Sequence, residues 1–144
     1  MDSNFTRRRF LESSAALLGV ALVGCSAEEV TAPKSAANPD GSISLTGLGE
    51  IAPGSAVAFT FPTGEAGLVF VTASGKSGAV SAKCTHSGCN VEWNEPVNAK
   101  VPLRCPCHES QFALDGKVLS GPAKAPLARY SVVRTGADAT LKRA

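Results

Sequence analysis

Two short segments hold all the cysteines and histidines of this chain except Cys25. The first reads CTHSGC over residues 84–89, and the second reads CPCH over residues 105–108. Together they spell C-x-H-x2-C, fifteen intervening residues, then C-P-C-H. Thiolate and imidazole are strong ligands for iron and zinc, so their gathering within 25 of the 144 residues predicts a metal centre carried on two loops.

The sequence around these segments predicts an all-β fold. Val57, Phe59 and Phe61 alternate with smaller or polar residues, which is the period of a strand with one buried face. Further short apolar or β-branched runs follow, separated mainly by turn residues: GLVFVT (67–72), GAVSA (78–82), VPLR (101–104), GKVLSG (116–121) and ARYSVVRT (128–135). Strands of this length and spacing are typical of an antiparallel β-sandwich or barrel.

The paired segments resemble the two signature boxes of Rieske [2Fe–2S] proteins, in the disulfide-bearing branch that includes cytochrome bc and arsenite-oxidase types. The resemblance covers roughly residues 47–133 and includes GPAKAPLARY (121–130), which is similar to the proline loop of that family. It implies a Rieske-type antiparallel β-sandwich of small sheets with two cluster-binding loops. It also implies one [2Fe–2S] cluster as the cofactor.

Each position of the two boxes takes a role from this resemblance. The implied roles are the inner iron for Cys84 and Cys105, the outer iron near the surface for His86 and His108, and a disulfide between Cys89 and Cys107. Replacing two thiolate ligands by neutral imidazoles removes negative charge around the cluster, which makes its reduction easier. Rieske centres therefore reach about −150 to +300 mV, against about −400 mV for plant-type ferredoxins.

Two positions after the second box are implied to tune the potential. Ser110 matches a family hydroxyl that donates a hydrogen bond to a bridging sulfide. Phe112 stands where higher-potential members carry a tyrosine whose hydroxyl bonds a cysteine ligand. Such hydrogen bonds stabilise the electron-rich reduced cluster, so a phenylalanine at 112 predicts an intermediate potential.

Two other residues differ from those of quinol-oxidising relatives. Ser87 replaces a leucine that shields the cluster and contacts the partner enzyme in those proteins. Glu109 replaces a usual glycine and is expected either to place a carboxylate beside His108 or to be a solvated surface charge.

Three alternative interpretations of this pattern account for it less well. A closed zinc site needs four donors, but zinc knuckles usually present C-x2-C pairs, which this chain lacks. Two plain disulfides would leave both histidines beside cysteines by accident. A Rieske oxygenase needs a further iron site with two more histidines, and the chain has only two in all, so the sequence excludes an oxygenase.

The first 25 residues predict an export signal. TRRRFL (6–11) resembles the twin-arginine motif, and an uncharged run from Ser13 to Ala27 follows it. LVGC (22–25) resembles a lipobox, which makes Cys25 a lipidation candidate. An uncleaved N-terminal anchor helix is the alternative, although about 20 strongly apolar residues are normally needed to span a bilayer.

The leader is followed by a predicted tether and then by the folded domain. Residues 26–41 are rich in Ala, Pro, Ser and Glu and are predicted to be flexible, so the Rieske domain is expected to occupy residues 42–144. A structural disulfide requires an oxidising compartment, which agrees with export to the periplasm, at the outer face of the cytoplasmic membrane.

Charge and family resemblance together define the expected partners. The formal net charge is only +2, and no basic stripe is present, so nucleic acid is not expected as a partner. The resemblance implies a membrane-tethered electron carrier between a donor such as quinol and a cytochrome-type acceptor. The alternatives are a small subunit of a periplasmic molybdenum oxidase, a free-standing lipoprotein, or a non-redox zinc module.

Overall fold

The computed structural model describes residues 32–144, and these form two antiparallel sheets without any helix. The predicted twin-arginine signal, Cys25 and residues 26–31 of the predicted tether lie outside the described residues. The expectation of an all-β fold built from antiparallel sheets is confirmed. Among residues 32–144 no helix has the length and apolar character needed to cross a bilayer.

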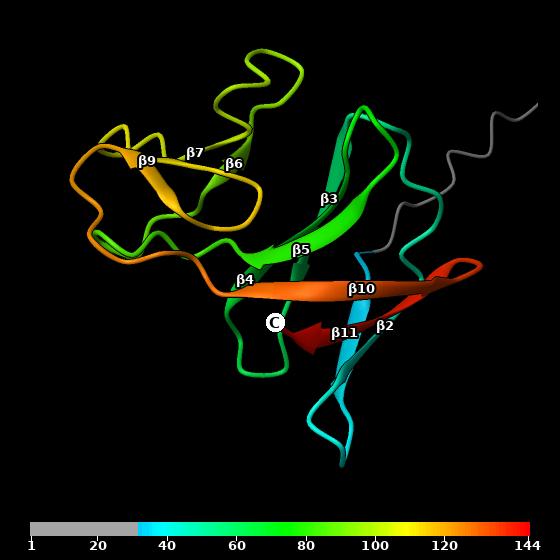
Figure 1. Cartoon of the computed structure of the whole chain (residues 1–144). Coiled ribbons are helices and arrows are strands. Elements are labelled where there is room, and N and C mark those ends of the chain that lie inside the picture. Colours follow the sequence, from blue (N-terminus) through cyan, green and yellow to red (C-terminus); the bar gives the residue numbers. More distant parts are fainter. Residues whose placement is uncertain (1–31) are drawn as a thin grey trace, which may run out of the picture.

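The larger sheet has seven strands and lies beside the smaller one (Figure 1). Its strand order is β1-β2-β11-β10-β5-β4-β3. The strands are β1 (Lys34–Ala37), β2 (Ile43–Thr46), β3 (Ser55–Thr60), β4 (Ala66–Val71), β5 (Ser77–Ser81), β10 (Arg129–Thr135) and β11 (Asp138–Arg143). Ser35 Oγ on β1 donates a hydrogen bond to the Thr60 carbonyl at the end of β3, so the two outer strands approach each other.

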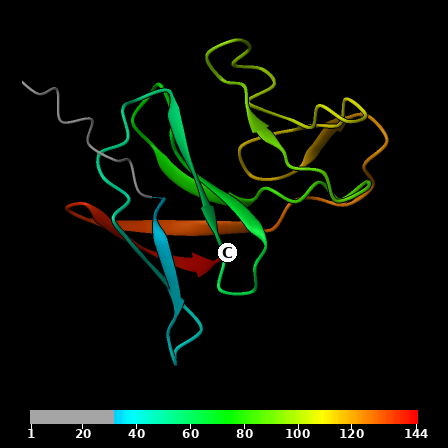
Figure 2. The same ribbon diagram turned by 180° about the vertical axis from the view of Figure 1, so that it is seen from behind.

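The smaller sheet has four short strands in the order β6-β7-β8-β9. These are β6 (Glu92–Trp93), β7 (Leu103–Arg104), β8 (Gln111–Phe112) and β9 (Val118–Ser120). All of them come from the segment between β5 and β10, which leaves the large sheet and returns to it. Figures 1 and 2 show this module beside the large sheet from opposite sides.

The sheet begins earlier than the sequence predicted. Residues 34–37 belong to the predicted tether 26–41, yet they form β1, which pairs antiparallel with β2 from Lys34 opposite Thr46 to Ala37 opposite Ile43. Backbone pairing explains this difference, because a strand at a sheet edge needs few large apolar side chains of its own. The low apolar content of KSAA therefore gave no signal of a strand.

Strand β4 separates two hydrophobic cores and joins the small module to the large sheet. Val69 and Val71 pack into the core of the large sheet, whereas Leu68 and Phe70 pack into the second core, which also contains residues of the small module. A strand buried on both faces gives a continuous apolar run instead of alternation. This explains the GLVFVT sequence, and it places the second core directly beneath the two cysteine-containing loops.

All six predicted strands are present, but five further strands were not predicted. The runs near residues 57, 67, 78, 103, 118 and 129 correspond to β3, β4, β5, β7, β9 and β10. Strands β1, β2, β6, β8 and β11 gave no clear signal. They are short or polar, and backbone pairing with neighbouring strands, including the hairpin of β10 with β11, defines them better than side-chain pattern does.

Candidate metal centre

The two cysteine-containing loops have the same backbone construction. The first loop, residues 84–89, lies between β5 and β6, and the second, residues 105–110, lies between β7 and β8. In the first loop the Cys84 N–H donates to the carbonyl of Cys89 at 2.8 Å, and in the second the Cys105 N–H donates to that of Ser110 at 2.8 Å. Each loop is therefore closed five residues after its first cysteine.

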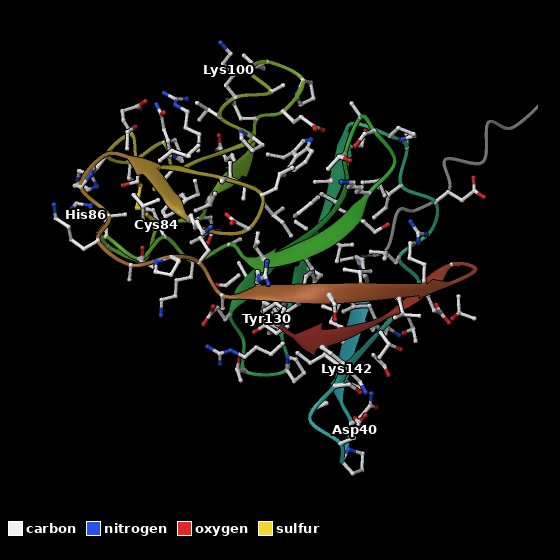
Figure 3. The ribbon with its side chains drawn as sticks, viewed as in Figure 1. Asp40, Cys84, His86, Lys100, Tyr130 and Lys142 are labelled. Carbon is white, nitrogen blue, oxygen red and sulfur yellow. A yellow bond between two sulfur atoms is a disulfide. The ribbon has the colours of Figure 1, made fainter. Side chains whose placement is uncertain are left out.

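Each loop carries a buried cysteine at its base and an exposed histidine nearer its tip. Cys84 is 2% exposed and Cys105 is 0% exposed, and both belong to the second hydrophobic core. His86 and His108 are exposed, and their ring centroids lie 4.7 Å apart with the ring planes at 84°. Cys84 and His86 occupy the loop end of the small module (Figure 3).

The two buried thiols contact each other. Burial raises the pKa of Cys105, and a hydrogen bond with Cys84 raises it further, so without a metal this thiol stays protonated. The backbone N–H groups of Cys107 and His108 act in the opposite direction, because they donate to the Cys105 sulfur and favour its thiolate. Such a pair of donors suits a thiolate bound to a cation, which supplies the missing positive charge.

The remaining cysteine of each loop forms a disulfide. Cys89 and Cys107 are joined, with their Cα atoms 6.5 Å apart and a separation of 18 positions in the sequence. The two remaining cysteines of the described chain, Cys84 and Cys105, are free. The predicted Cys89–Cys107 pairing is thus confirmed, and the alternative of two plain disulfides is wrong.

A third loop, residues 121–126, covers the two others. Thr85 Oγ1 donates to the Ala125 carbonyl at 2.6 Å, and the Ala123 N–H donates to Ser110 Oγ at 3.2 Å. Gly121 allows this close approach, since its φ is +95° and a Cβ there would lie 2.6 Å from the Ser110 Cα. The sequence predicted this proline loop but not the contact of Thr85 with it, since the only signal of Thr85 is a hydroxyl inside the first box.

Ser110 has a hydroxyl proton available for a ligand at the loop base. The side chain is 0% exposed, and its oxygen accepts the Ala123 N–H. Within residues 32–144 no acceptor receives the proton of this hydroxyl. A buried hydroxyl normally donates as well as accepts, so the site has the chemistry expected where an electron-rich group is held.

Phe112 is a core residue. It is 0% exposed and packs in the same cluster as Cys84 and Cys105. The interpretation of this ring as core packing is therefore correct. The effect of Phe112 on the potential stays a prediction.

Glu109 does not direct its carboxylate toward the histidine next to it. Its oxygens accept three hydrogen bonds from Arg104, one from Nε at 2.8 Å and two from Nη2 at 2.7 and 2.5 Å. The residue has a φ of 61°, a conformation that glycine adopts without strain. The arginine thus neutralises the glutamate, and the loop tolerates a non-glycine residue there.

The four candidate ligands form two pairs. The thiols of Cys84 and Cys105 form one pair, and the imidazoles of His86 and His108 form the other. In the described part of the chain no three Cys, His, Asp or Glu side chains gather around a single point. Two pairs of unlike donors suit a centre with two metal ions, whereas a closed zinc site requires all four donors around one ion.

Residues 45–131 match the family of the Rieske [2Fe–2S] domain, which is more than half of the chain. The chain belongs to the Rieske [2Fe–2S] family. It therefore carries a [2Fe–2S] cluster, a one-electron redox group. The donor set fits this cofactor, because two buried thiols, two exposed imidazoles and a free hydroxyl proton meet at one end of the module.

Individual Rieske proteins are similar to this chain in sequence. The cytochrome b6-f complex iron-sulfur subunit of Chlorobaculum thiosulfatiphilum is 32% identical over 117 residues, which is 81% of this chain and 55% of the relative. The corresponding subunit of Chlorobaculum tepidum is 43% identical over 65 residues, which is 45% of this chain and 34% of the relative. The chain thus spans only about a third to a half of the length of these two relatives.

A solved structure shows the same fold. The plasma membrane Rieske protein PetC3 from Synechocystis PCC 6803 matches with a TM-score of 0.51 and 35% sequence identity. The match covers 60% of this chain and 85% of that protein. The fold and family therefore rest on independent comparisons of sequence and structure.

Proposed function

We propose that Cys84 and Cys105 bind the inner iron of the cluster and that His86 and His108 bind the outer iron. The observation that carries this assignment is the separation of the donors into a buried thiol pair and an exposed imidazole pair. The cluster accepts and releases one electron at a time. The exposed histidines make the outer iron the side from which an electron leaves toward a partner.

The protein surroundings of this site favour a cluster of raised potential. Neutral imidazoles leave the oxidised cluster less negatively charged than four thiolates would, so an added electron is held more strongly. The Ser110 proton and the N–H groups that face the Cys105 sulfur stabilise the negative charge of the reduced cluster. Burial of both cysteines keeps water from weakening these interactions.

We further propose that the protein is a membrane-attached redox subunit at the periplasmic face, exported by the twin-arginine route. It passes electrons from a donor such as quinol to a cytochrome-type acceptor. The similarity to cytochrome b6-f iron-sulfur subunits supports this role. The leader supports the location, because twin-arginine export moves folded proteins that already contain their cofactor.

A second candidate is a small subunit of a molybdenum oxidase or a free-standing lipoprotein. Ser87 favours this candidate, because quinol-oxidising relatives carry a leucine at this position. The Ser87 side chain is exposed, and its hydroxyl lies 3.4 Å from His108 Nδ1. An exposed hydroxyl contributes less apolar contact to a quinol-binding partner.

Expression of the full chain in a host with twin-arginine export tests the proposed function. The expected product contains two irons and two acid-labile sulfides per chain and gives a rhombic electron paramagnetic resonance signal after reduction. Copurification of a b-type cytochrome supports the quinol route, and copurification of a molybdenum protein supports the second candidate. Colourless protein that contains zinc would refute the electron-transfer function.

Phe112→Tyr is expected to raise the midpoint potential of the cluster. The new hydroxyl would lie in the core beside both cysteines, where it can donate to a ligand sulfur and stabilise the reduced state. A hydrogen bond to a charged group contributes about 1.5–3 kcal/mol in all, and about 1.4 kcal/mol corresponds to 59 mV for one electron. We therefore expect a rise of tens of millivolts, below about 130 mV. A redox titration followed by circular dichroism measures it.

Ser110→Ala is the companion of this substitution. It removes the free hydroxyl proton and the acceptor of the Ala123 N–H while changing the side-chain volume little, so the midpoint potential should fall by a similar amount. Phe112→Leu serves as a control for altered packing without a hydroxyl. If Phe112→Tyr shifts the potential no more than Phe112→Leu does, the hydrogen-bond explanation is incorrect.

A further inference from the structure

A cavity of about 1010 Å³ lies against the first cluster loop. Cys84, Thr85, His86, Ser87 and Gly88 form one wall. Strands β10 and β11, together with the segments that lead into β9 and β10, contribute the remaining wall, which includes Lys117, Arg129 and Arg143. The cavity therefore borders the exposed His86 directly, at the end of the module where an electron leaves the cluster.

The charged residues of this cavity are unevenly neutralised. Its two acidic side chains already have partners, since Asp115 pairs with Lys117 and Glu65 accepts a hydrogen bond from Ser81. The cationic side chains of Lys83, Arg129 and Arg143 also line the cavity and are exposed. Within residues 32–144 none of these three forms an ion pair. Four cationic side chains, those of Lys83, Lys117, Arg129 and Arg143, thus line the cavity against the two carboxylates of Glu65 and Asp115, which leaves an excess of two positive charges.

Apart from the exposed Lys124 on the third loop, the rest of the surface near the cluster is close to neutral. In the second loop the only charged residue, Glu109, is paired with Arg104. The first loop, residues 84–89, contains no Asp, Glu, Lys or Arg. The cavity is therefore the main source of positive potential beside the first loop, although the whole chain has a formal net charge of only +2.

We infer that this cavity docks an acidic surface of a cytochrome-type electron acceptor. The inference rests on the proposed electron-transfer function and adds the chemistry of the partner. Complementary charge raises the association rate of redox proteins by about 10- to 1000-fold, and their interfaces are small enough for one such patch to dominate. An acidic segment in the cavity would bring the acceptor against His86. There the reduced cluster loses one electron and a ferric haem becomes ferrous.

Cytochrome c in two forms provides a probe of this docking. Native cytochrome c is basic, and succinylation of its lysines makes the same haem protein acidic. Stopped-flow mixing with the reduced full-chain protein measures the second-order rate constant with each form. At about 0.1 M ionic strength the Debye length is about 10 Å, so only charges near the docking site affect the rate. The succinylated form should react faster per unit driving force, and added salt should slow it.

Arg143→Glu and Lys142→Glu form a matched pair of charge reversals. They are neighbours on β11, so their side chains point to opposite faces, and Lys142 pairs with Asp40 instead of lining the cavity. Figure 3 shows Lys142 and Asp40 well away from His86. We expect Arg143→Glu, and likewise Lys83→Glu, to slow the acidic cytochrome at least about threefold. Lys142→Glu should leave its rate within experimental error.

The inference is overturned if Arg143→Glu and Lys142→Glu change the rate equally, because the effect would then come from net charge alone. It is also overturned if Lys83→Glu leaves the rate of electron transfer to the acidic cytochrome unchanged but abolishes binding to phosphatidylglycerol vesicles. That result would assign the cavity to an anionic lipid surface. Each variant must keep the midpoint potential and resonance spectrum of the parent. A parent without a cluster refutes the proposed function instead, so the two failures are distinguishable.

Discussion

His86→Cys should lower the midpoint potential of the cluster by about 250 mV or more, or prevent its assembly. A thiolate at this position adds a negative charge next to the outer iron and disfavours the reduced state. About 250 mV is the gap between the lower end of the Rieske range and the value for plant-type ferredoxins. The exposure of His86 on its loop gives a cysteine room to bind without rebuilding the core.

Iron analysis, the visible spectrum and redox titration measure this effect. His86→Ala, which supplies no ligand, should lose iron outright, and His108→Cys should behave as His86→Cys does. Ser87→Ala is the matched control, because it changes an exposed residue of the same loop and leaves all four proposed iron ligands in place. A His86→Cys protein with the parent potential and spectrum would contradict the assignment of His86 as an iron ligand.

The same substitution distinguishes the cluster from a zinc site. Zinc binds cysteine as readily as histidine, so a zinc protein would keep one metal ion and stay colourless after His86→Cys. It would also show no potential to shift. A change of colour and potential can only follow from a redox-active centre.

The sequence predicted the chemistry of the site better than its surroundings. Rare residue types at fixed spacing identify Cys84, His86, Cys105 and His108 as a set of candidate donors, because chemistry restricts which side chains bind iron. The Cys89–Cys107 pairing followed from family resemblance and is present in the structure. Backbone interactions carry no such restriction, so the closure of each loop by the N–H of its first cysteine could not be predicted.

Contacts between segments that are distant in sequence are the main features that the sequence did not predict. Thr85 and Ala125 are 40 positions apart, and only the fold shows that the hydroxyl of one meets the carbonyl of the other. The pairing of Glu109 with Arg104 was missed for a different reason. Arg104 lies at the end of β7 and Glu109 lies in the second loop, and a spacing of five positions does not by itself predict a contact. The loop, with a φ of 61° at Glu109, brings the two side chains together.

The paired substitution Cys89→Ala with Cys107→Ala should destabilise the folded domain by about 3 kcal/mol. A disulfide restricts the unfolded chain, and closure of a loop of roughly this length gives about that value on the chain-entropy model. The loss is large compared with the 5–15 kcal/mol total stability of an ordinary domain. Denaturant unfolding of the parent and of the paired variant measures it.

The cluster should also become labile in this variant. The disulfide is the covalent link between the two loops, and the remaining direct contacts between them include a 3.4 Å approach of Ser87 Oγ to His108 Nδ1. Without the disulfide the imidazole pair can separate, so iron should be released to a chelator faster than from the parent.

Replacing both cysteines together matters for interpretation. A single Cys89→Ala change would leave a thiol at Cys107, next to His108, where it could compete as an iron ligand. Chemical reduction of the parent disulfide is a control that alters no side chain permanently, and it should reproduce both the lower stability and the faster iron release. If the paired variant keeps its iron and unfolds at the parent denaturant concentration, the hydrogen bonds and packing of the loops alone must hold the cluster.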